Sequence, residues 1–147
     1  MTAEAIVTAA RTYLGTPWKH QARLRGVGVD CIGLLVGAYR EAGYAIEDCT
    51  DYGRCPNPRR FLGNLAKQFR RVSGNNDLEA QADPQAWRFA IPGDLLVFQF
   101  AGAHLPQHVG ISTGSSVIHT YQTAGHVAEH ALSAEWKAKV HSVWRVR

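Results

Sequence analysis

One cysteine stands where its thiol could act as a nucleophile. Cys31 opens a stretch, at about residues 31–42, in which Leu34, Leu35 and Ala38 recur on one face at helical spacing. The amino end of a helix offers partial positive charge and free N–H groups, which favour a thiolate. Taken alone, this pattern favours a small buried residue on an amphipathic helix. The interpretation changes if the sequence also supplies a base.

Two histidines on neighbouring extended segments could supply that base. Residues 107–111 alternate between polar and apolar, so His108 and Val109 face opposite sides of a strand. The next extended segment, residues 116–121, carries His119. A histidine facing a cleft can deprotonate a thiol, and a second one can hydrogen-bond the first and fix its tautomer. The pattern predicts Cys31 as nucleophile, His108 as general base and His119 as orienting residue.

The other cysteines indicate no disulfide framework. Cys49 and Cys55 bring the total to three, an odd number without a C-x-x-C pair, so a zinc ribbon is not indicated either. We interpret both as structural or incidental, and at least one thiol must be free.

A metal site is a rival hypothesis. His104 and His108, with Cys31 or His119, could bind zinc, but residues four apart align only on a helix, and Pro106 argues against a helix there. We therefore expect no metal and no cofactor.

The first half of the chain has the periodicity of helices. Residues 2–14 form an apolar stripe behind a Thr2 cap, and residues 31–42 form a second helix. A third begins at Asn57-Pro58, a cap followed by a first-position proline, and residues 73–76 end it.

The second half has shorter, extended runs. Helices followed by neighbouring strands predict an α+β fold, with N-terminal helices packed on an antiparallel β-sheet. We expect one domain over residues 1–147, with residues 44–90 as a variable middle segment that lacks a clear motif. The expected strands are residues 94–98, 108–112, 116–121, 127–129 and 141–146.

Composition and charge exclude several classes of protein. With 46% hydrophobic and 19% charged residues, the chain is neither disordered nor fibrous. Residues 1–14 have no secretory signal pattern, and no run of about 18 apolar residues could span a membrane. A net charge of +4 suits polyanions, but the basic residues are scattered and no nucleic-acid motif accompanies them. We expect no specific nucleic-acid partner.

Five motifs, in order, carry a family resemblance. They are Leu14-Gly15-Thr16-Pro17-Trp18, Val29-Asp30-Cys31-Ile32-Gly33-Leu34, Pro92-Gly93-Asp94-Leu95-Leu96, His108-Val109-Gly110-Ile111 and Val117-Ile118-His119. Together they resemble the NlpC-type family of cell-wall cysteine peptidases. The chain is most similar to the short subgroup encoded with bacteriophage tail genes, which carries a His-Gln pair where His20-Gln21 stands here.

The resemblance implies a papain-like fold and a set of roles. Cys31, His108 and His119 match the nucleophile, the general base and the third polar residue. Trp18 takes the place of an aromatic residue that lines the substrate cleft, and Asp30 shapes the start of the cysteine helix.

Two departures from the family pattern affect the substrate side of the site. Ile32 replaces a common serine, and residues 19–22 replace a paired glycine. His20 therefore has three open roles: lining the cleft, contributing to the oxyanion hole, or lying on the loop without contact to substrate. We group Trp18, His20 and Asp30 as candidate substrate-binding residues.

The expected function is that of a cysteine endopeptidase that hydrolyses stem-peptide bonds in peptidoglycan. The subgroup resemblance implies a phage tail-tip component that opens the cell wall during infection, with other tail-tip proteins as partners. Its expected location is the virion, after synthesis in the host cytoplasm without a signal peptide. The alternative is a catalytically silent tail-assembly protein that uses the same fold as an interaction module.

Overall fold

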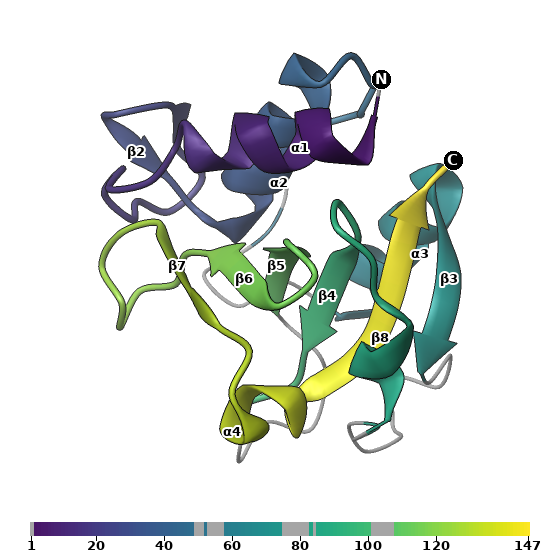
Figure 1. Ribbon diagram of the computed structural model, residues 1–147. Coiled ribbons are helices and arrows are strands. Elements are labelled where there is room, and N and C mark those ends of the chain that lie inside the picture. The colour runs from purple at the N-terminus through teal and green to yellow at the C-terminus, as the bar shows by residue number, and fades with distance from the viewer. Residues whose placement is uncertain (1, 49–51, 53–57, 75–82, 84, 101–107) are drawn as a thin grey trace.

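A six-stranded antiparallel sheet organises the molecule (Figure 1). The computed structural model describes residues 2–48, 52, 58–74, 83, 85–100 and 108–147. Strand order across the sheet is β3-β8-β4-β5-β6-β7. The strands are β3 (Phe69–Gly74), β4 (Leu95–Phe98), β5 (His108–Ser112), β6 (Ser116–His119), β7 (Ala128–Ala131) and β8 (Val140–Val146).

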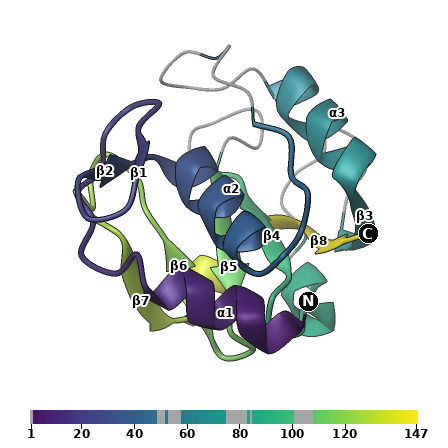
Figure 2. The same cartoon turned by 90° about the horizontal axis from the view of Figure 1, so that it is seen from above.

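Two helices, α1 (Ala3–Arg11) and α2 (Cys31–Glu41), lie together on one face of the sheet (Figure 2). The α1 helix begins where the Thr2 hydroxyl accepts a hydrogen bond from the N–H of Ala5 at 3.0 Å. Its apolar side and that of α2 bury a common core with alternate residues of the strands. On β4, for example, Leu95 and Val97 face the helices.

The opposite face of the sheet has its own smaller core. Leu96 and Phe98 of β4 pack there against side chains from two short helical turns, η1 (Ala86–Phe89) and α4 (Ala134–Lys137). Strand β4 is buried along its whole length because both of its faces are covered.

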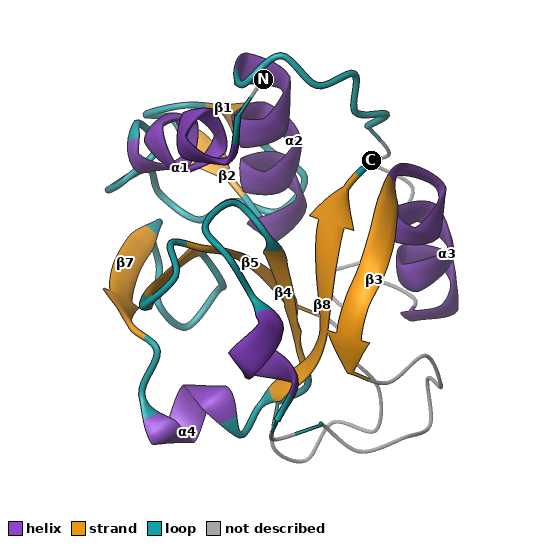
Figure 3. Cartoon of the chain, turned by 45° about the vertical axis from the view of Figure 1, so that its right-hand side comes forward, coloured by secondary structure: helices purple, strands orange, loops and turns teal. Residues whose placement is uncertain are grey.

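Helix α3 (Pro58–Gln68) leads directly into β3 at the sheet edge (Figure 3). The prediction that residues 73–76 end this helix is wrong, because the helix ends at Gln68 and residues 69–74 form a strand. Strand β3 pairs with β8, with an irregularity between Arg71 and Ser73. The sequence did not indicate this strand, because Arg70 and Arg71 are both exposed and interrupt the alternation of polar and apolar residues. The predicted cap Asn57 lies outside the described residues.

The remaining predictions of elements agree with the structure to within a few residues. The prediction of an α+β fold, with helices packed on an antiparallel sheet, is confirmed. Two short strands precede α2 and were not predicted: β1 (Arg23–Leu24) and β2 (Gly28–Val29), which pair with each other. Among the described residues, no helix is long and apolar enough to cross a membrane.

Candidate active site

Asp30 shapes the start of α2 and so positions Cys31. Its backbone is extended, and its Oδ1 accepts a hydrogen bond from the N–H of Gly33 at 2.8 Å, as an N-cap residue does. Because the cap ends the preceding extended segment, Cys31 becomes the first residue of the helix. The sequence expectation that Asp30 shapes the helix start agrees with this geometry.

The Asp30 carboxylate also holds the loop before α2. Its oxygens accept hydrogen bonds from the N–H of Gln21 at 2.8 Å, from the Arg23 guanidinium at 3.0 Å and from the Tyr52 hydroxyl at 2.6 Å. Gln21 has a positive φ of 59°, a strained conformation for a residue with a side chain. This network ties Tyr52, from the variable middle segment, to the residue next to the candidate nucleophile.

The sulfur of Cys31 lies beside strand β5, at Val109. Strands β5 and β6 pair only at Ile111 and Ser112, so the N–H of Val109 lies beyond their paired residues. That N–H lies near the Cys31 sulfur and acts to lower its pKa, as do the N–H groups of Ile32 and of Cys31 itself. Cys31 is partly exposed as a residue, whereas its thiol is buried.

His108 and His119 face the same side of the sheet, and their rings are hydrogen-bonded. Nε2 of His108 lies 2.7 Å from Nδ1 of His119, and both residues are buried. The contact predicted from the sequence is therefore present. Since Nε2 of His108 is engaged, Nδ1 is the ring nitrogen left to serve the thiol. Among the described residues no hydrogen bond joins His108 to Cys31, which is common in sites without substrate.

A third histidine, His130, was not singled out from the sequence and extends the hydrogen-bonded pair of His108 and His119. Nε2 of His119 lies 2.7 Å from Nε2 of His130, and Nδ1 of His130 lies 2.9 Å from the carbonyl oxygen of Ala131. His130 stands on β7, a short and partly buried strand without a recognisable motif. The only signal for it in the sequence is a histidine on the strand next to His119.

Aromatic rings surround the histidine pair and keep water away from it. Phe100 stacks on His108 with ring centroids 5.1 Å apart, and Trp136 meets His119 edge-on at 4.8 Å. Burial, and then the neighbouring His119, holds the pKa of His108 well below its usual value. Burial, and then the neighbouring His130, lowers the pKa of His119 to about 3. Both imidazoles are therefore neutral at physiological pH.

The thiol environment differs from the sequence expectation of a lowered pKa. Burial of the thiol, followed by the negative charge of Asp30, raises the pKa of Cys31 to about 12. The three N–H groups at the sulfur act in the opposite direction but are the smaller effects. Thiolate and imidazolium are each unfavourable alone, whereas transferring the thiol proton to His108 creates opposite charges that attract each other. Deprotonation of Cys31 and protonation of His108 therefore favour each other.

Trp18 and His20 lie on the loop that flanks the cysteine helix. Trp18 forms an isolated β-bridge with Val29, which lies two residues before Cys31. The backbone N–H of Trp18 donates a hydrogen bond to the Gly125 carbonyl at 2.8 Å. His20 packs edge-on against Tyr52 with ring centroids 5.8 Å apart. Both side chains are half-buried. The structure describes no contact of either one with Cys31, so their substrate-binding roles stay predictions.

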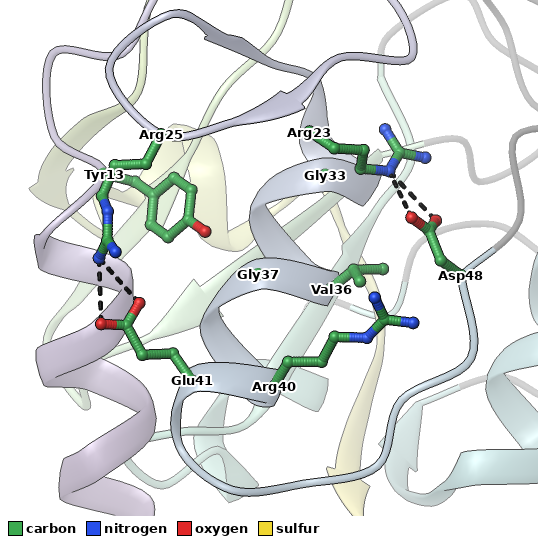
Figure 4. Close-up of a pocket in the computed structure, with 9 residues that line it drawn as sticks. All are labelled: Tyr13, Arg23, Arg25, Gly33, Val36, Gly37, Arg40, Glu41 and Asp48. Atoms are coloured by element: carbon green, nitrogen blue, oxygen red, sulfur yellow. Dashed lines mark hydrogen bonds and ion pairs between the residues drawn. The ribbon is translucent and has the colours of Figure 1, made fainter.

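A separate pocket of about 490 Å³ lies along the face of α2 that carries Gly33, Val36 and Gly37 (Figure 4). Two of its arginines are paired within the protein: Arg25 with Glu41 at 2.8 Å, and Arg23 with Asp48 at 2.9 Å. These ion pairs offset much of the positive charge of the pocket. It is lined by Tyr13, Arg23, Arg25, Gly33, Val36, Gly37, Arg40, Glu41 and Asp48.

Metal ligation finds no support in the part of the chain that the structure describes. No group of three or more His, Cys, Asp or Glu side chains there could hold a metal ion. His104, Cys49 and Cys55, named in the sequence hypotheses, lie outside the described residues.

A thiol at a helix start, beside strands that carry hydrogen-bonded histidines, defines the papain-like class of α+β folds. The model of the NlpC/P60 family matches residues 15–145 of this chain. The chain therefore belongs to the NlpC/P60 family, the family of peptidoglycan hydrolases and endopeptidases that the sequence motifs resemble.

Individual relatives agree with this assignment. A probable endopeptidase of Corynebacterium glutamicum is 31% identical over 132 residues, which are 89% of this chain and 49% of that protein. The chain thus spans about half the length of the curated relatives it matches.

Two solved structures from Mycobacterium tuberculosis share the fold. The peptidoglycan hydrolase RipB has a TM-score of 0.58 and 21% identity, over 99% of this chain and 65% of RipB. RipD, described as a non-catalytic NlpC/p60 domain protein adapted to peptidoglycan binding, has a TM-score of 0.57 and 16% identity, over 99% of this chain and 97% of RipD. Since hydrolytic and non-catalytic proteins share this fold, the fold alone does not distinguish between them.

Proposed function

We propose that the protein is a cysteine endopeptidase that hydrolyses stem-peptide bonds of peptidoglycan. One observation carries the proposal: the Cys31 sulfur lies against the N–H of Val109, and His108, the preceding residue, is hydrogen-bonded through Nε2 to His119. This arrangement leaves Nδ1 of His108 as the available base. Family membership supplies the substrate class, and scission next to D-glutamate is the bond choice that the motif resemblance implies.

In this mechanism His108 and Cys31 share one proton. Nδ1 of His108 takes the thiol proton as sulfur attacks the peptide carbonyl carbon, and backbone N–H groups near Cys31 stabilise the oxyanion. The imidazolium then protonates the leaving amine, and the C–N bond breaks to leave a thioester. Water, deprotonated by His108, hydrolyses the thioester and releases the thiol. His119 holds the imidazole ring throughout.

Assays of purified sacculi test the chemistry. Wild-type protein is expected to release new muropeptides whose masses identify the scissile bond, whereas Cys31→Ala is expected to release none above background. Cys31→Ser is a matched control, since it replaces the thiol by a hydroxyl of similar size that is a far weaker nucleophile. Equal digestion by wild type and Cys31→Ala would exclude this nucleophile.

Cell-wall opening from a phage tail tip is the biological setting that we propose for this activity. Its support is the His20-Gln21 pair, which matches the tail-associated subgroup of the family. In this setting the partners are other tail-tip proteins and the location is the virion. An antibody against the chain is expected to label one end of purified tails in electron micrographs, and particles without label would contradict this role.

A silent interaction module is the second candidate, favoured by the similarity to RipD. Such a module would bind sacculi without cleaving them. Co-sedimentation of wild type with sacculi, together with an unchanged muropeptide profile, would identify the module, whereas release of new muropeptides would exclude it.

A further inference from the structure

His130 ends a chain of hydrogen bonds that begins at the candidate base. The chain runs from Nε2 of His108 to Nδ1 of His119, and from Nε2 of His119 to Nε2 of His130, with both separations 2.7 Å. It finishes at the backbone carbonyl of Ala131, 2.9 Å from Nδ1 of His130. Each of the three imidazoles is therefore hydrogen-bonded through at least one ring nitrogen to the next group in the series.

The carbonyl sets the direction of every hydrogen bond in this chain. A carbonyl oxygen can only accept, so Nδ1 of His130 carries the hydrogen. In neutral His130 the other nitrogen, Nε2, is then an acceptor, and Nε2 of His119 must donate to it. His119 in turn offers an unprotonated Nδ1, to which Nε2 of His108 donates. Nδ1 of His108 is left with its lone pair.

The surroundings keep this chain rigid. β7 pairs with β6 along four residues, so the Ala131 carbonyl is held relative to His119. The indole of Trp136 packs on the rings of His119 and His130, with centroid separations of 4.8 Å and 5.1 Å. His119 is 2% exposed, so water has little access to replace a lost partner.

We propose that His130 is a positioning residue that sets the tautomers of His119 and His108 and thereby keeps Nδ1 of His108 unprotonated for the Cys31 thiol. The inference deepens the proposed peptidase function and rests on it. His130 contacts no reacting atom; it acts through His119. Without an acceptor at this position, His119 favours the tautomer that donates from Nδ1, and His108 must then carry its hydrogen on Nδ1, where it blocks the base.

Two substitutions separate this role from a packing role. His130→Phe keeps an aromatic ring beside Trp136 but removes the acceptor. His130→Gln places an amide oxygen near the position of Nε2 and keeps it. The readout is the ring-nitrogen spectrum of ¹⁵N-histidine-labelled protein without substrate, in which protonated and lone-pair nitrogens have different chemical shifts. Wild type and His130→Gln are expected to carry the His108 hydrogen on Nε2, and His130→Phe on Nδ1.

Muropeptide release supplies the second readout. His130→Phe is expected to lower kcat by about 100-fold or more, since a wrong histidine tautomer can abolish most of the catalysis of a triad. KM is expected to change little, and His130→Gln to recover most of kcat. Should His130→Phe not fold, His130→Leu tests the same loss of acceptor with a smaller side chain.

The two readouts keep the inference distinct from the function on which it rests. Wild-type tautomers retained in His130→Phe, or a kcat equal to that of wild type, would overturn the role of His130. If wild type releases no muropeptides while the tautomers shift as expected, the proposed peptidase function fails and the structural coupling through His130 stands.

Discussion

At the scale of single residues, the dominant feature of the site is that its surroundings disfavour isolated charges. Burial raises the pKa of Cys31 to about 12 and lowers that of His119 to about 3, and it holds the pKa of His108 well below normal. A neutral thiol and a neutral imidazole are the resting state that these shifts favour. In the proposed mechanism, proton transfer from the thiol to the imidazole accompanies attack, as in general-base catalysis.

Thiol alkylation tests this coupling. His108→Ala removes the proposed acceptor for the Cys31 proton, so we expect the pH midpoint for alkylation of Cys31 by iodoacetamide to rise, because burial and Asp30 both disfavour the thiolate. Wild-type protein should react at lower pH because His108 accepts the proton. Mass spectrometry of the Cys31 peptide separates this thiol from Cys49 and Cys55. Identical profiles for both proteins would show that His108 does not serve the thiol.

Asp30 has opposing effects on stability and on thiol reactivity. Asp30→Asn weakens a buried pair with Arg23 and bonds to the loop, so we expect the free energy of unfolding to fall by about 3 kcal/mol in urea denaturation. The same change removes a negative charge beside the thiol, so the alkylation midpoint of Cys31 should move to lower pH.

An exposed ion pair provides the control for Asp30. Glu41→Gln breaks the pair with Arg25 on the surface and is expected to change stability by less than about 1 kcal/mol. A comparable loss in both variants would argue against a special role for the Asp30 network.

At the scale of elements, the close approach of β5 and β6 positions the histidines. Gly110 lies between them: a Cβ built there would lie 2.5 Å from Cγ2 of Val117 and 3.1 Å from Cβ of His119. Strand β6 can therefore pass beside β5 only because this residue lacks a side chain.

Gly110→Ala tests this packing. We expect a loss of about 1–3 kcal/mol in the free energy of unfolding, because the strands must separate to admit the methyl group. Muropeptide release should fall as well, since His119 moves with β6. Gly63→Ala is the control: Gly63 lies in α3 with open space around it, and alanine there should stabilise by about 0.5–1 kcal/mol through helix propensity. Full activity of Gly110→Ala would contradict the positioning role of Gly110.

At the scale of the whole molecule, buried neutral histidines link stability to pH. The folded pKa values of His108 and His119 lie below the unfolded value of about 6.5, so the unfolded chain binds more protons in acid. The stabilisation is fully present above about pH 6.5 and is lost as the pH falls toward the folded pKa values. Each histidine contributes a slope of up to about 1.4 kcal/mol per pH unit in this window.

Urea denaturation across pH measures that slope. Between about pH 6.5 and 4.5 we expect the free energy of unfolding of wild type to decrease, and His119→Gln to show a shallower decrease. Glu129, whose pKa is lowered mainly by its hydrogen bond to Arg11, contributes only below about 4.5, so the window separates it from the histidines. Equal slopes for wild type and His119→Gln would show that the buried ring does not drive the acid loss of stability.

Much of the fold, and the central contact of the site, could be predicted from local patterns. The helical face that begins at Cys31 and the alternation around His108 depend on residues close in sequence, so periodicity alone places them. The hydrogen bond between His108 and His119 also follows from adjacent strands joined by a short turn. Strand β3 was missed because its pairing with β8, more than 60 residues away, outweighs its weak local pattern.

By itself, the sequence determined the α+β architecture, the family motifs and the order of Cys31, His108 and His119, because each is encoded by neighbouring residue types. Only the tertiary structure decided that Tyr52 bonds to Asp30, that His130 continues the histidine chain, and that the thiol pKa is raised. These features depend on side chains brought together from distant segments and on how far water is excluded between them. Neither distance in space nor hydration follows from local periodicity, since both arise when the helices and the sheet pack.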